Sequence, residues 1–482
     1  MAVAQGTCPG CGAPIEFGVG SSVSKVCDYC RATVLRSDRG LENLGRIADI
    51  ANTPSLIAVG DQGTLAGRPF TVMGRVQLDH GAGPWDEYYV AFDYGTAWGW
   101  LAFAQGNWYV TAQTSAVPIP PYEALRLEMD LPLGASGTLR VGELKQGTIS
   151  SAEGELPGVF RPGQIRYYAD CFGQQGAFAT LDYGDRSHPP ELFIGWVFPE
   201  AQMQVTAVGP RTVQKVATDR IRCPSCGGDI PKLSGERALR VGCPFCGAVS
   251  DIAAQTVIST QEAARSRPEI PIGARGVFDG TEYVCTATMT RMAEVEGELF
   301  SWDEYLLFSQ GIGYRWLVKD EGNWSWVVEV NIAELDLSRM PGLVTWNGRS
   351  FTARNQNEAI VDYVLGEVYW KVTVGDVTSV MDFVNGTDVL SREASAGEVH
   401  WSFSRQLPWS VIAQGFGLPL DSPAGASETA TSGSSASGCT TALVLVVIII
   451  VVLVLCIGMG TCGSGGSSGS SRGGSGVFTG GK

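Results

Sequence analysis

Two cysteine-rich stretches decide the fold: residues 8–30 read CPGCGAPIEFGVGSSVSKVCDYC, and residues 223–246 read CPSCGGDIPKLSGERALRVGCPFC. Each contains two Cys-x2-Cys pairs, separated by fifteen residues in the first stretch and sixteen in the second. Two such pairs can bring four thiolates to one point, which is the ligand set of a zinc ribbon. The spacing therefore predicts two structural zinc ions, held by Cys8, Cys11, Cys27, Cys30, Cys223, Cys226, Cys243 and Cys246.

The alternative for these cysteines is a disulfide framework in a secreted protein. No apolar signal segment precedes Cys8, which favours reduced thiolates and a cytoplasmic location. Because the four ligands of each site are all protein sulfurs, we expect structural rather than catalytic zinc. Three of the four pairs continue as Cys-Pro-x-Cys-Gly, whereas Cys27–Cys30 is followed by Arg31 and lacks both the proline and the glycine.

The composition favours a β-rich, globular chain. Of the 482 residues, 62 are glycine and 24 are proline, which is typical of many short strands joined by turns. A hydrophobic content of 44% excludes a disordered chain. The net charge of −15 argues against nucleic acid as a partner of the whole molecule, although a basic excess around the second ribbon keeps a zinc-ribbon nucleic-acid binder as a third hypothesis.

The sequence after each ribbon is duplicated. Trp85-Asp86-Glu87-Tyr88 recurs as Trp302-Asp303-Glu304-Tyr305, and further matching segments follow at similar offsets: Gly106-Asn107-Trp108 with Gly322-Asn323-Trp324, and Gly154-Glu155-Leu156 with Gly366-Glu367-Val368. Alternating apolar residues and Gly-Asn turns predict antiparallel strands with tight hairpins at Gly106 and Gly322. We therefore expect a mainly β fold with two antiparallel β modules, each a sandwich or an open barrel.

The expected domain boundaries follow from these motifs. They are zinc ribbon 1 at 1–36, a helical connector at 37–54, β module 1 at 55–208, zinc ribbon 2 at 218–250, a helical connector at 251–266, β module 2 at 267–418, a Ser/Gly/Ala linker at 419–439, a transmembrane helix at 440–461 and a Gly/Ser-rich tail at 462–482.

The C-terminal part contains the apolar run ALVLVVIIIVVLVLCI at 442–457. With its uncharged flanks it reaches about 20 residues, enough to cross a bilayer as a helix. A buried core helix is the alternative, but the Ser/Gly-rich flanks offer nothing to bury it. Reduced zinc ribbons require the cytosol, so we expect a single-pass protein of the bacterial cell membrane with its bulk in the cytoplasm and a short tail outside.

A repeated aromatic and acidic set is the candidate ligand site. The simpler interpretation is strand packing, with acidic residues facing water. The sharper one is a site where carboxylates and aromatic faces attract a cation. No catalytic signature is evident, so we expect no enzyme. The set comprises Trp85, Asp86, Glu87, Tyr88, Trp108, Trp302, Asp303, Glu304, Tyr305 and Trp324.

These motifs resemble the bacterial domain-of-unknown-function 4178 family, over roughly 55–200 and 268–408. The resemblance rests on the Trp-Asp-Glu-Tyr runs, the Gly-Asn-Trp hairpins and the Gly-Glu segments. It implies modules that pair with zinc ribbons, often encoded near small membrane proteins and polyamine-synthesis enzymes, and it implies no assigned activity.

Together these observations predict a membrane-anchored binding or scaffold protein with a protein partner at the membrane. The alternative is an enzyme or sensor that acts on a small cationic metabolite, such as a polyamine, through the aromatic and acidic set.

Overall fold

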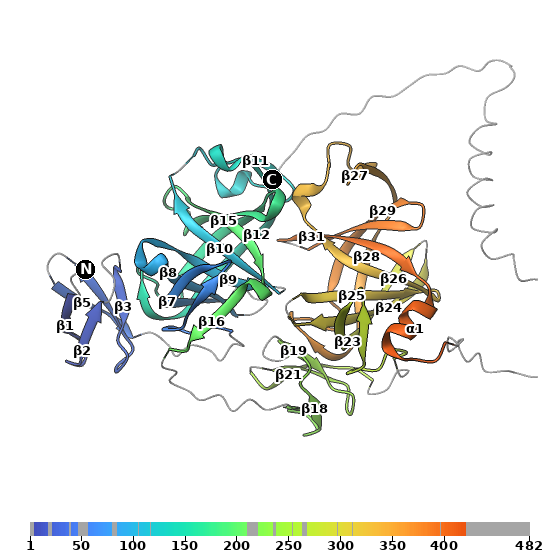
Figure 1. Cartoon of the computed structure of the whole chain (residues 1–482), viewed down its shortest axis with the longest axis horizontal. Coiled ribbons are helices and arrows are strands. Elements are labelled where there is room, and N and C mark those ends of the chain that lie inside the picture. The colour runs from blue at the N-terminus through green and yellow to red at the C-terminus, as the bar shows by residue number, and fades with distance from the viewer. Residues whose placement is uncertain are drawn as a thin grey trace, which may run out of the picture. The chain divides into compact units, whose positions relative to one another are not determined.

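The computed structural model describes residues 4–17, 22–37, 40–46, 56–79, 84–104, 106–115, 117–209, 220–234, 238–252, 254–262, 268–295, 297–310, 312–395 and 397–420 (Figure 1). Within these ranges the chain is mainly antiparallel β-structure, as predicted, with short 3-10 turns and the α-helix α1 (Trp409–Phe416). No helix in the described part is long and apolar enough to cross a membrane. The predicted transmembrane helix at 440–461 and the tail at 462–482 lie outside the described residues.

Each cysteine stretch folds into short hairpins. In ribbon 1, β1 (Ala4–Thr7) pairs with β2 (Pro14–Phe17), and β3 (Ser24–Val26) pairs with β4 (Ala32–Ser37). In ribbon 2 the corresponding strands are β17 (Arg220–Arg222), β18 (Asp229–Pro231), β19 (Arg240–Gly242) and β20 (Ala248–Asp251). A Cys-x2-Cys pair lies in the turn of each hairpin, so four hairpins supply the two sets of ligands.

The prediction of helical connectors is wrong where the structure describes them. The chain continues from each ribbon as one more antiparallel strand: β5 (Gly40–Arg46) pairs with β4, and β21 (Thr256–Thr260) pairs with β20. A short run with apolar residues three apart does not separate helix from strand, and the β-branched sequence TVIST of β21 favours the strand. Pairing with the ribbon also satisfies backbone groups at its edge.

The first β module is a closed eight-stranded barrel within the described residues. Its strands, in spatial order, are β7 (Arg68–Asp79), β8 (Pro84–Phe92), β9 (Ala97–Ala104), β10 (Asn107–Thr114), β15 (Glu191–Pro199), β14 (Ala177–Gly184), β13 (Ile165–Phe172) and β12 (Thr138–Leu156). Pairing of β12 with β7 closes the ring. The two alternatives of a sandwich and an open barrel thus give way to a closed barrel, which leaves no edge strand.

The second module repeats this ring. Its strands, in spatial order, are β23 (Thr281–Val295), β24 (Glu298–Ser309), β25 (Gly313–Asp320), β26 (Asn323–Val330), β31 (Val399–Leu407), β30 (Asp388–Ala394), β29 (Val377–Asn385) and β28 (Arg349–Val368), and β28 closes on β23. The predicted hairpins are confirmed at β9–β10 and β25–β26, where Gly106 and Gly322 adopt φ values of 81° and 84°. We refer to the modules as barrel 1 and barrel 2.

Additional segments cover the outside of each barrel. In barrel 1, β6 (Gln62–Leu65) and β16 (Met203–Ala207) lie over one apolar cluster, and β11 (Asp130–Pro132) with its flanking loop lies over another. Between these two clusters Trp196 of β15 is 56% exposed in mid-strand. The strand face that carries the two clusters is therefore the outer face of the barrel. In barrel 2 the covering elements are β22 (Arg275–Phe278), β27 (Leu343–Trp346) and α1. Alternate residues of the same strands face the barrel interiors.

Candidate metal centres and barrel interiors

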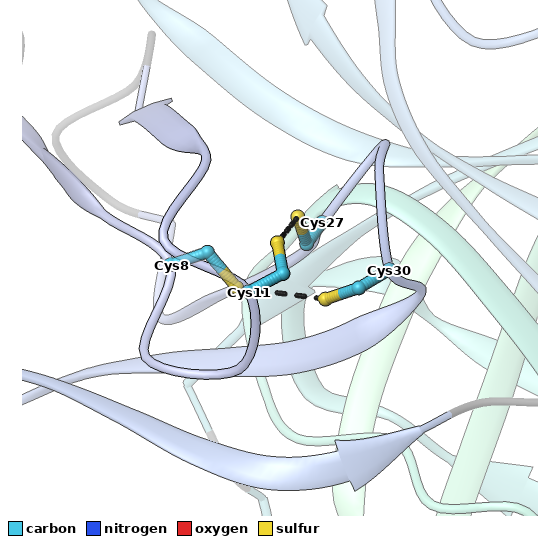
Figure 2. Close-up of side chains that lie close together, drawn as sticks. All are labelled: Cys8, Cys11, Cys27 and Cys30. Atoms are coloured by element: carbon cyan, nitrogen blue, oxygen red, sulfur yellow. Dashed lines mark hydrogen bonds between the residues drawn. The ribbon is translucent and has the colours of Figure 1, made fainter.

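The first cysteine set converges as predicted. Figure 2 shows the two turns facing each other, with Sγ–Sγ distances of 3.6 Å between Cys8 and Cys30 and 3.8 Å between Cys11 and Cys27. The turn geometry explains the residues: the glycine after the first pair, Gly12, has φ 77°, whereas Arg31 takes the same left-handed conformation at 58°. A side chain is disfavoured there, so the pair without a glycine is the strained corner of this ribbon.

The second set has the same geometry. The Sγ–Sγ distances are 3.7 Å between Cys223 and Cys246 and 3.8 Å between Cys226 and Cys243. Both following glycines, Gly227 and Gly247, are left-handed as well, with φ values of 73° and 69°. In each set all four sulfurs lie within 4.8 Å of one another.

These distances fit a tetrahedral metal site. Four thiolates at about 2.3 Å from a central zinc ion stand about 3.8 Å apart. Backbone N–H groups of Gly10 and Gly228 also point to Cys8 Sγ and Cys226 Sγ, both at 3.4 Å, as expected where amides stabilise thiolate charge. The structure thus contains two candidate four-cysteine metal sites.

Each ribbon is joined to its barrel at the repeated Gly-Glu segment. Strand β3 pairs with β12 at Glu155, and β19 pairs with β28 at Gly366 and Glu367. Gly154 and Gly366 have φ values of 74° and 86°, and a Cβ on either would lie 2.3 Å or 2.2 Å from a carbonyl oxygen of the neighbouring strand. Only glycine permits this approach.

The glutamate beside each glycine is a buried anchor for the ribbon. Glu367, 1% exposed, accepts hydrogen bonds from the backbone N–H groups of Leu233 and Ser234 and from the Ser234 hydroxyl, at 2.7–2.9 Å. Glu155 accepts one from the Ser22 hydroxyl at 3.0 Å, and Lys25 lies 3.5 Å away. The Gly-Glu segments therefore attach the ribbons to the barrels.

The aromatic and acidic set does not form one site in either barrel. Strand alternation places Asp86 and Tyr88 on the outer face, where Asp86 pairs with Arg75 and Tyr88 packs in one cluster with Trp108. Barrel 2 repeats this arrangement: Asp303 accepts a hydrogen bond from Thr290, and the ring centroids of Tyr305 and Trp324 lie 5.2 Å apart. These contacts on the outer face support the packing interpretation.

Trp85 and Glu87 have the opposite orientation, into barrel 1. Two charged groups act on Glu87 of β8 from strands that are not adjacent to β8 in the ring: Asp182 on β14 and Arg166 on β13. Burial is the main cause that raises the pKa of Glu87 to about 7, with Asp182 adding to it and Arg166 opposing. Asp170 on β13 also has its pKa raised to about 7, chiefly by burial and then by Glu143. Barrel 1 thus has an acidic interior.

In barrel 2 the matching pair has an arginine partner. Trp302 Nε1 donates to Glu304 Oε1 at 2.7 Å, and Arg291 Nη1 lies 3.4 Å from that oxygen and 3.0 Å from Glu393 Oε2. The Arg291 guanidinium also lies 5.8 Å from the Trp302 ring centroid. Burial raises the pKa of Glu304, and Arg291 opposes that rise. Sequence reasoning missed Arg291 because it has no counterpart in the first copy.

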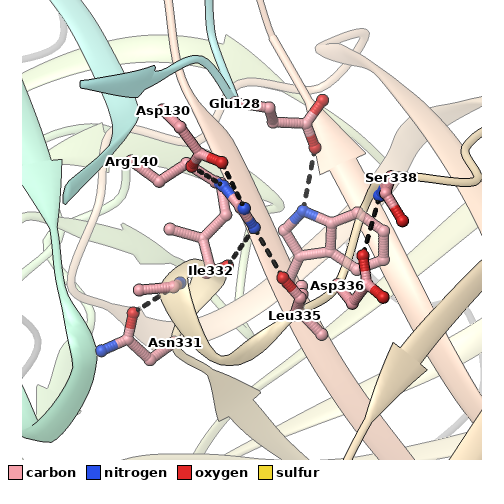
Figure 3. A network of polar contacts seen from close by, with 10 residues as sticks. Glu128, Asp130, Arg140, Asn331, Ile332, Leu335, Asp336 and Ser338 are labelled. Carbon is pink, nitrogen blue, oxygen red and sulfur yellow. Dashed lines mark hydrogen bonds and ion pairs between the residues drawn. The ribbon is translucent and has the colours of Figure 1, made fainter. Parts of the chain in front are cut away.

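A polar network between the barrels was also missed. Glu128 accepts hydrogen bonds from Arg392 Nε at 2.8 Å and from Trp401 Nε1 at 3.0 Å. Arg140 donates to the carbonyls of Ile332 and Leu335, as Figure 3 shows. Glu128 has φ 67°, a conformation that these contacts to barrel 2 stabilise. The partners lie at least 192 residues apart in sequence, so no local pattern signals them.

A second junction contains Glu143, Glu398 and His400, whose ligand atoms lie within 4.8 Å of one another. Lys145 forms ion pairs with both glutamates, so an ammonium group already lies among these carboxylates. Burial alone would lower the pKa of His400, but its hydrogen bond and charge interaction with Glu398 raise it to about 9. We interpret this cluster as an inter-barrel ion network.

Comparison with protein families identifies the barrels. The chain belongs to the family of the domain of unknown function DUF4178, whose model matches residues 58–200 and 271–408. The match confirms the resemblance, with a four-cysteine cluster before each segment. No curated protein and no solved structure matches the chain.

Proposed function

We propose that this member of the DUF4178 family is a membrane-anchored cytoplasmic binding protein, whose ribbons contain structural zinc. The observation that supports this most is that each four-cysteine set has one of its two hairpins in a sheet that continues into a barrel. A metal in that position stabilises the ribbon that is anchored to the Gly-Glu segment, and its four ligands are all protein sulfurs. This supports a structural role for the metal, and the binding function is then assigned to the barrels.

The proposed metal is zinc because tetrahedral tetrathiolate sites select zinc or iron–sulfur chemistry, and the paired Cys-x2-Cys knuckles are the zinc-ribbon pattern. Metal binding to such small hairpins supplies folding free energy that their few apolar residues do not. Ribbon 1 illustrates this, since its buried cluster consists of two cysteines and three small or aliphatic residues, namely Cys8, Ile15, Cys27, Ala32 and Val34.

The proposed anchor is the apolar run at 442–457, within 440–461. Because thiolate ligands require a reducing compartment, the ribbons and barrels lie in the cytoplasm. The tail at 462–482 then lies on the other side of the membrane. The proposed partner is a protein at the same membrane.

Membrane fractionation tests the anchor. A chain that lacks 439–462 is expected in the soluble fraction with its zinc content unchanged, whereas the full chain sediments with the membrane and resists carbonate extraction. A matched control removes the same number of residues from the Gly/Ser-rich sequence that flanks the run. If the chain without 439–462 stays in the membrane fraction, the proposed anchor is wrong.

A further inference from the structure

Strand β12 of barrel 1 has a free stretch on one of its two edges. On that edge it pairs with β11 over 138–140 and with β7 over 148–154, and no described strand of barrel 1 pairs with the residues between them. There the backbone N–H of Leu144 donates to the carbonyl oxygen of Gly397 at 2.7 Å. Gly397 lies in the turn between β30 and β31, so the tip of a hairpin of barrel 2 adds to this edge of β12.

The contacts of this tip define what fits the edge. A Cβ on Gly397 would lie 2.6 Å from the carbonyl oxygen of Leu144, so a larger residue would push the tip away. Next to it, Glu398 forms an antiparallel bridge with Glu143, and Lys145 forms ion pairs with both glutamates. The docked tip therefore presents a glycine, followed by a residue that matches the charges of the edge.

Strand β28 of barrel 2 has the same free stretch. It pairs with β27 and then with β23, and residues 353–359 between these segments pair with neither. On the opposite edge, Asn355 pairs with Asp382 of β29, as Glu143 pairs with Asp170 of β13. Both strands have a register shift immediately before this pair. These matches align the two strands residue by residue.

Among the described residues, no strand pairs with the free edge of β28. Gln356 is the counterpart of Leu144, and over 354–359 the strand pairs with β29 alone among the described strands. Arg354, Asn355 and Gln356 are exposed, whereas Leu144 is half-buried where the tip contacts it. Unpaired backbone groups on such an edge are a ready template for another strand.

Neither of the two equivalent hairpin tips of this chain suits that edge. The tip at Gly397 is bound to β12. The corresponding turn of barrel 1, between β14 and β15, packs on its own barrel: Arg186 forms an ion pair with Glu123, and its guanidinium lies 4.0 Å from the Tyr167 ring centroid. That turn ends in Pro189-Pro190, and prolines lack the N–H groups that strand addition uses. The occupant then comes from another protein.

The side chains along the free edge differ in charge from those of barrel 1. Asn355 and Asn357 stand where barrel 1 has Glu143 and Lys145. Without the ammonium group, a carboxylate at the position of Glu398 would lack a cation, which is costly once the tip covers it. The two amides can instead donate to and accept from an uncharged polar side chain. The matching tip thus has a glycine and then an uncharged polar residue.

We propose that the free edge of β28, residues 354–358, is the docking site for the tip of a β-hairpin of a partner protein. The tip adds as a short antiparallel strand, and the backbone N–H of Gln356 donates to its carbonyl as Leu144 donates to Gly397. The tip has glycine at that contact and an uncharged polar residue after it. This inference rests on the proposed binding function and names the surface that it uses, whereas the fractionation experiment above tests the anchor alone.

Hydrogen–deuterium exchange of the full chain in detergent, resolved to single amides, tests whether the edge is free. The amide of Leu144 should be protected by its bond to Gly397, and the amide of Gln356 should exchange about tenfold faster or more. Equal protection of Gln356 in the chain alone would overturn the proposal, because the edge would then be covered already.

Calorimetry with a peptide probe tests docking on the same chain. The probe is a cyclised peptide of residues 389–404, which is the β30–β31 hairpin, with Glu398→Gln. We expect one peptide per chain and slower exchange at the amide of Gln356. Gln356→Pro removes the donor and should weaken binding about tenfold or more. The matched control Gln204→Pro places proline in the exposed edge strand β16 and should leave binding unchanged.

A change in the peptide tests the contact without altering the protein. The same probe with Gly397→Val should not bind, because its side chain would meet the backbone of the edge. Zinc content and circular dichroism confirm that each protein variant is folded. The proposal is overturned if millimolar probe gives no heat, if the Gly397→Val probe binds equally well, or if Gln356→Pro binds as wild type does. Dimerisation of the chain that Gln356→Pro abolishes would assign the edge to a second copy and overturn it as well.

Discussion

Glu367 is a buried carboxylate that holds ribbon 2 to barrel 2, beside the pairing of β19 with β28. We predict that Glu367→Gln opens this attachment without unfolding the barrel. Glutamine has the same shape but replaces one oxygen by an NH2 group, which then faces the N–H of Leu233 or of Ser234. A hydrogen bond to a charged group contributes about 1.5–3 kcal/mol, and a buried amide left without an acceptor costs about 1–3 kcal/mol.

The net effect is about 3 kcal/mol, which corresponds to roughly a hundredfold larger fraction of chains with the ribbon detached. Hydrogen–deuterium exchange with mass spectrometry measures this directly in peptides that contain Leu233 and Ser234. The matched variant Glu155→Gln should accelerate exchange around Ser22 in ribbon 1 and leave ribbon 2 unchanged. Unaltered exchange at Leu233 and Ser234 in Glu367→Gln would refute the anchoring role of this carboxylate.

Two further predictions follow from the same geometry. Gly366→Ala should destabilise the chain by about 2–3 kcal/mol and lower its melting temperature by several degrees. The reason is that the new Cβ would lie 2.2 Å from the Thr286 carbonyl oxygen, at a residue whose φ is 86°. A thermal melt compares this variant with Gly386→Ala, an exposed position with nothing near its Cβ. Glu128→Gln should lower the free energy of unfolding by about 2 kcal/mol and speed hydrogen exchange around Trp401, because it removes a bidentate ion pair with Arg392. Exchange at the wild-type rate around Trp401 would contradict the network.

The metal sites and the duplication could be predicted because their signals are local. Spacing within Cys8–Cys30 and Cys223–Cys246 determines which sulfurs can meet, and the turn residues around Gly106 and Gly322 determine the hairpins. The strained turn at Arg31 follows from the same reasoning, since its pair lacks the glycine that the other turns have.

Ring closure and the connectors could not be predicted in this way. Closure depends on pairs such as Ile149 with Leu78, which lie far apart in the sequence, and no turn motif encodes them. The first connector was expected to be helical, and the pairing of β5 with β4 that makes it a strand is a contact that its own apolar spacing does not encode.

The sequence alone could divide the residues of the candidate ligand set between the two faces of their strand. Strand alternation alone places Trp85 and Glu87 on one face and Asp86 and Tyr88 on the other. What the sequence does not show is which face is inside, because outer covering segments bury the outer face as well. The role of Arg291 depends on strand register, which pairs it with Trp302 across β23 and β24.

Metal content of the full chain, purified under reducing conditions, tests the central claim most directly. The account predicts two zinc ions per chain by mass spectrometry of the elements, falling to one in Cys11→Ser and to one in Cys226→Ser, with protection from hydrogen exchange lost only in the ribbon that is changed. Fewer than one zinc per wild-type chain, iron in its place, or Cys8–Cys30 and Cys223–Cys246 joined as disulfides would contradict it.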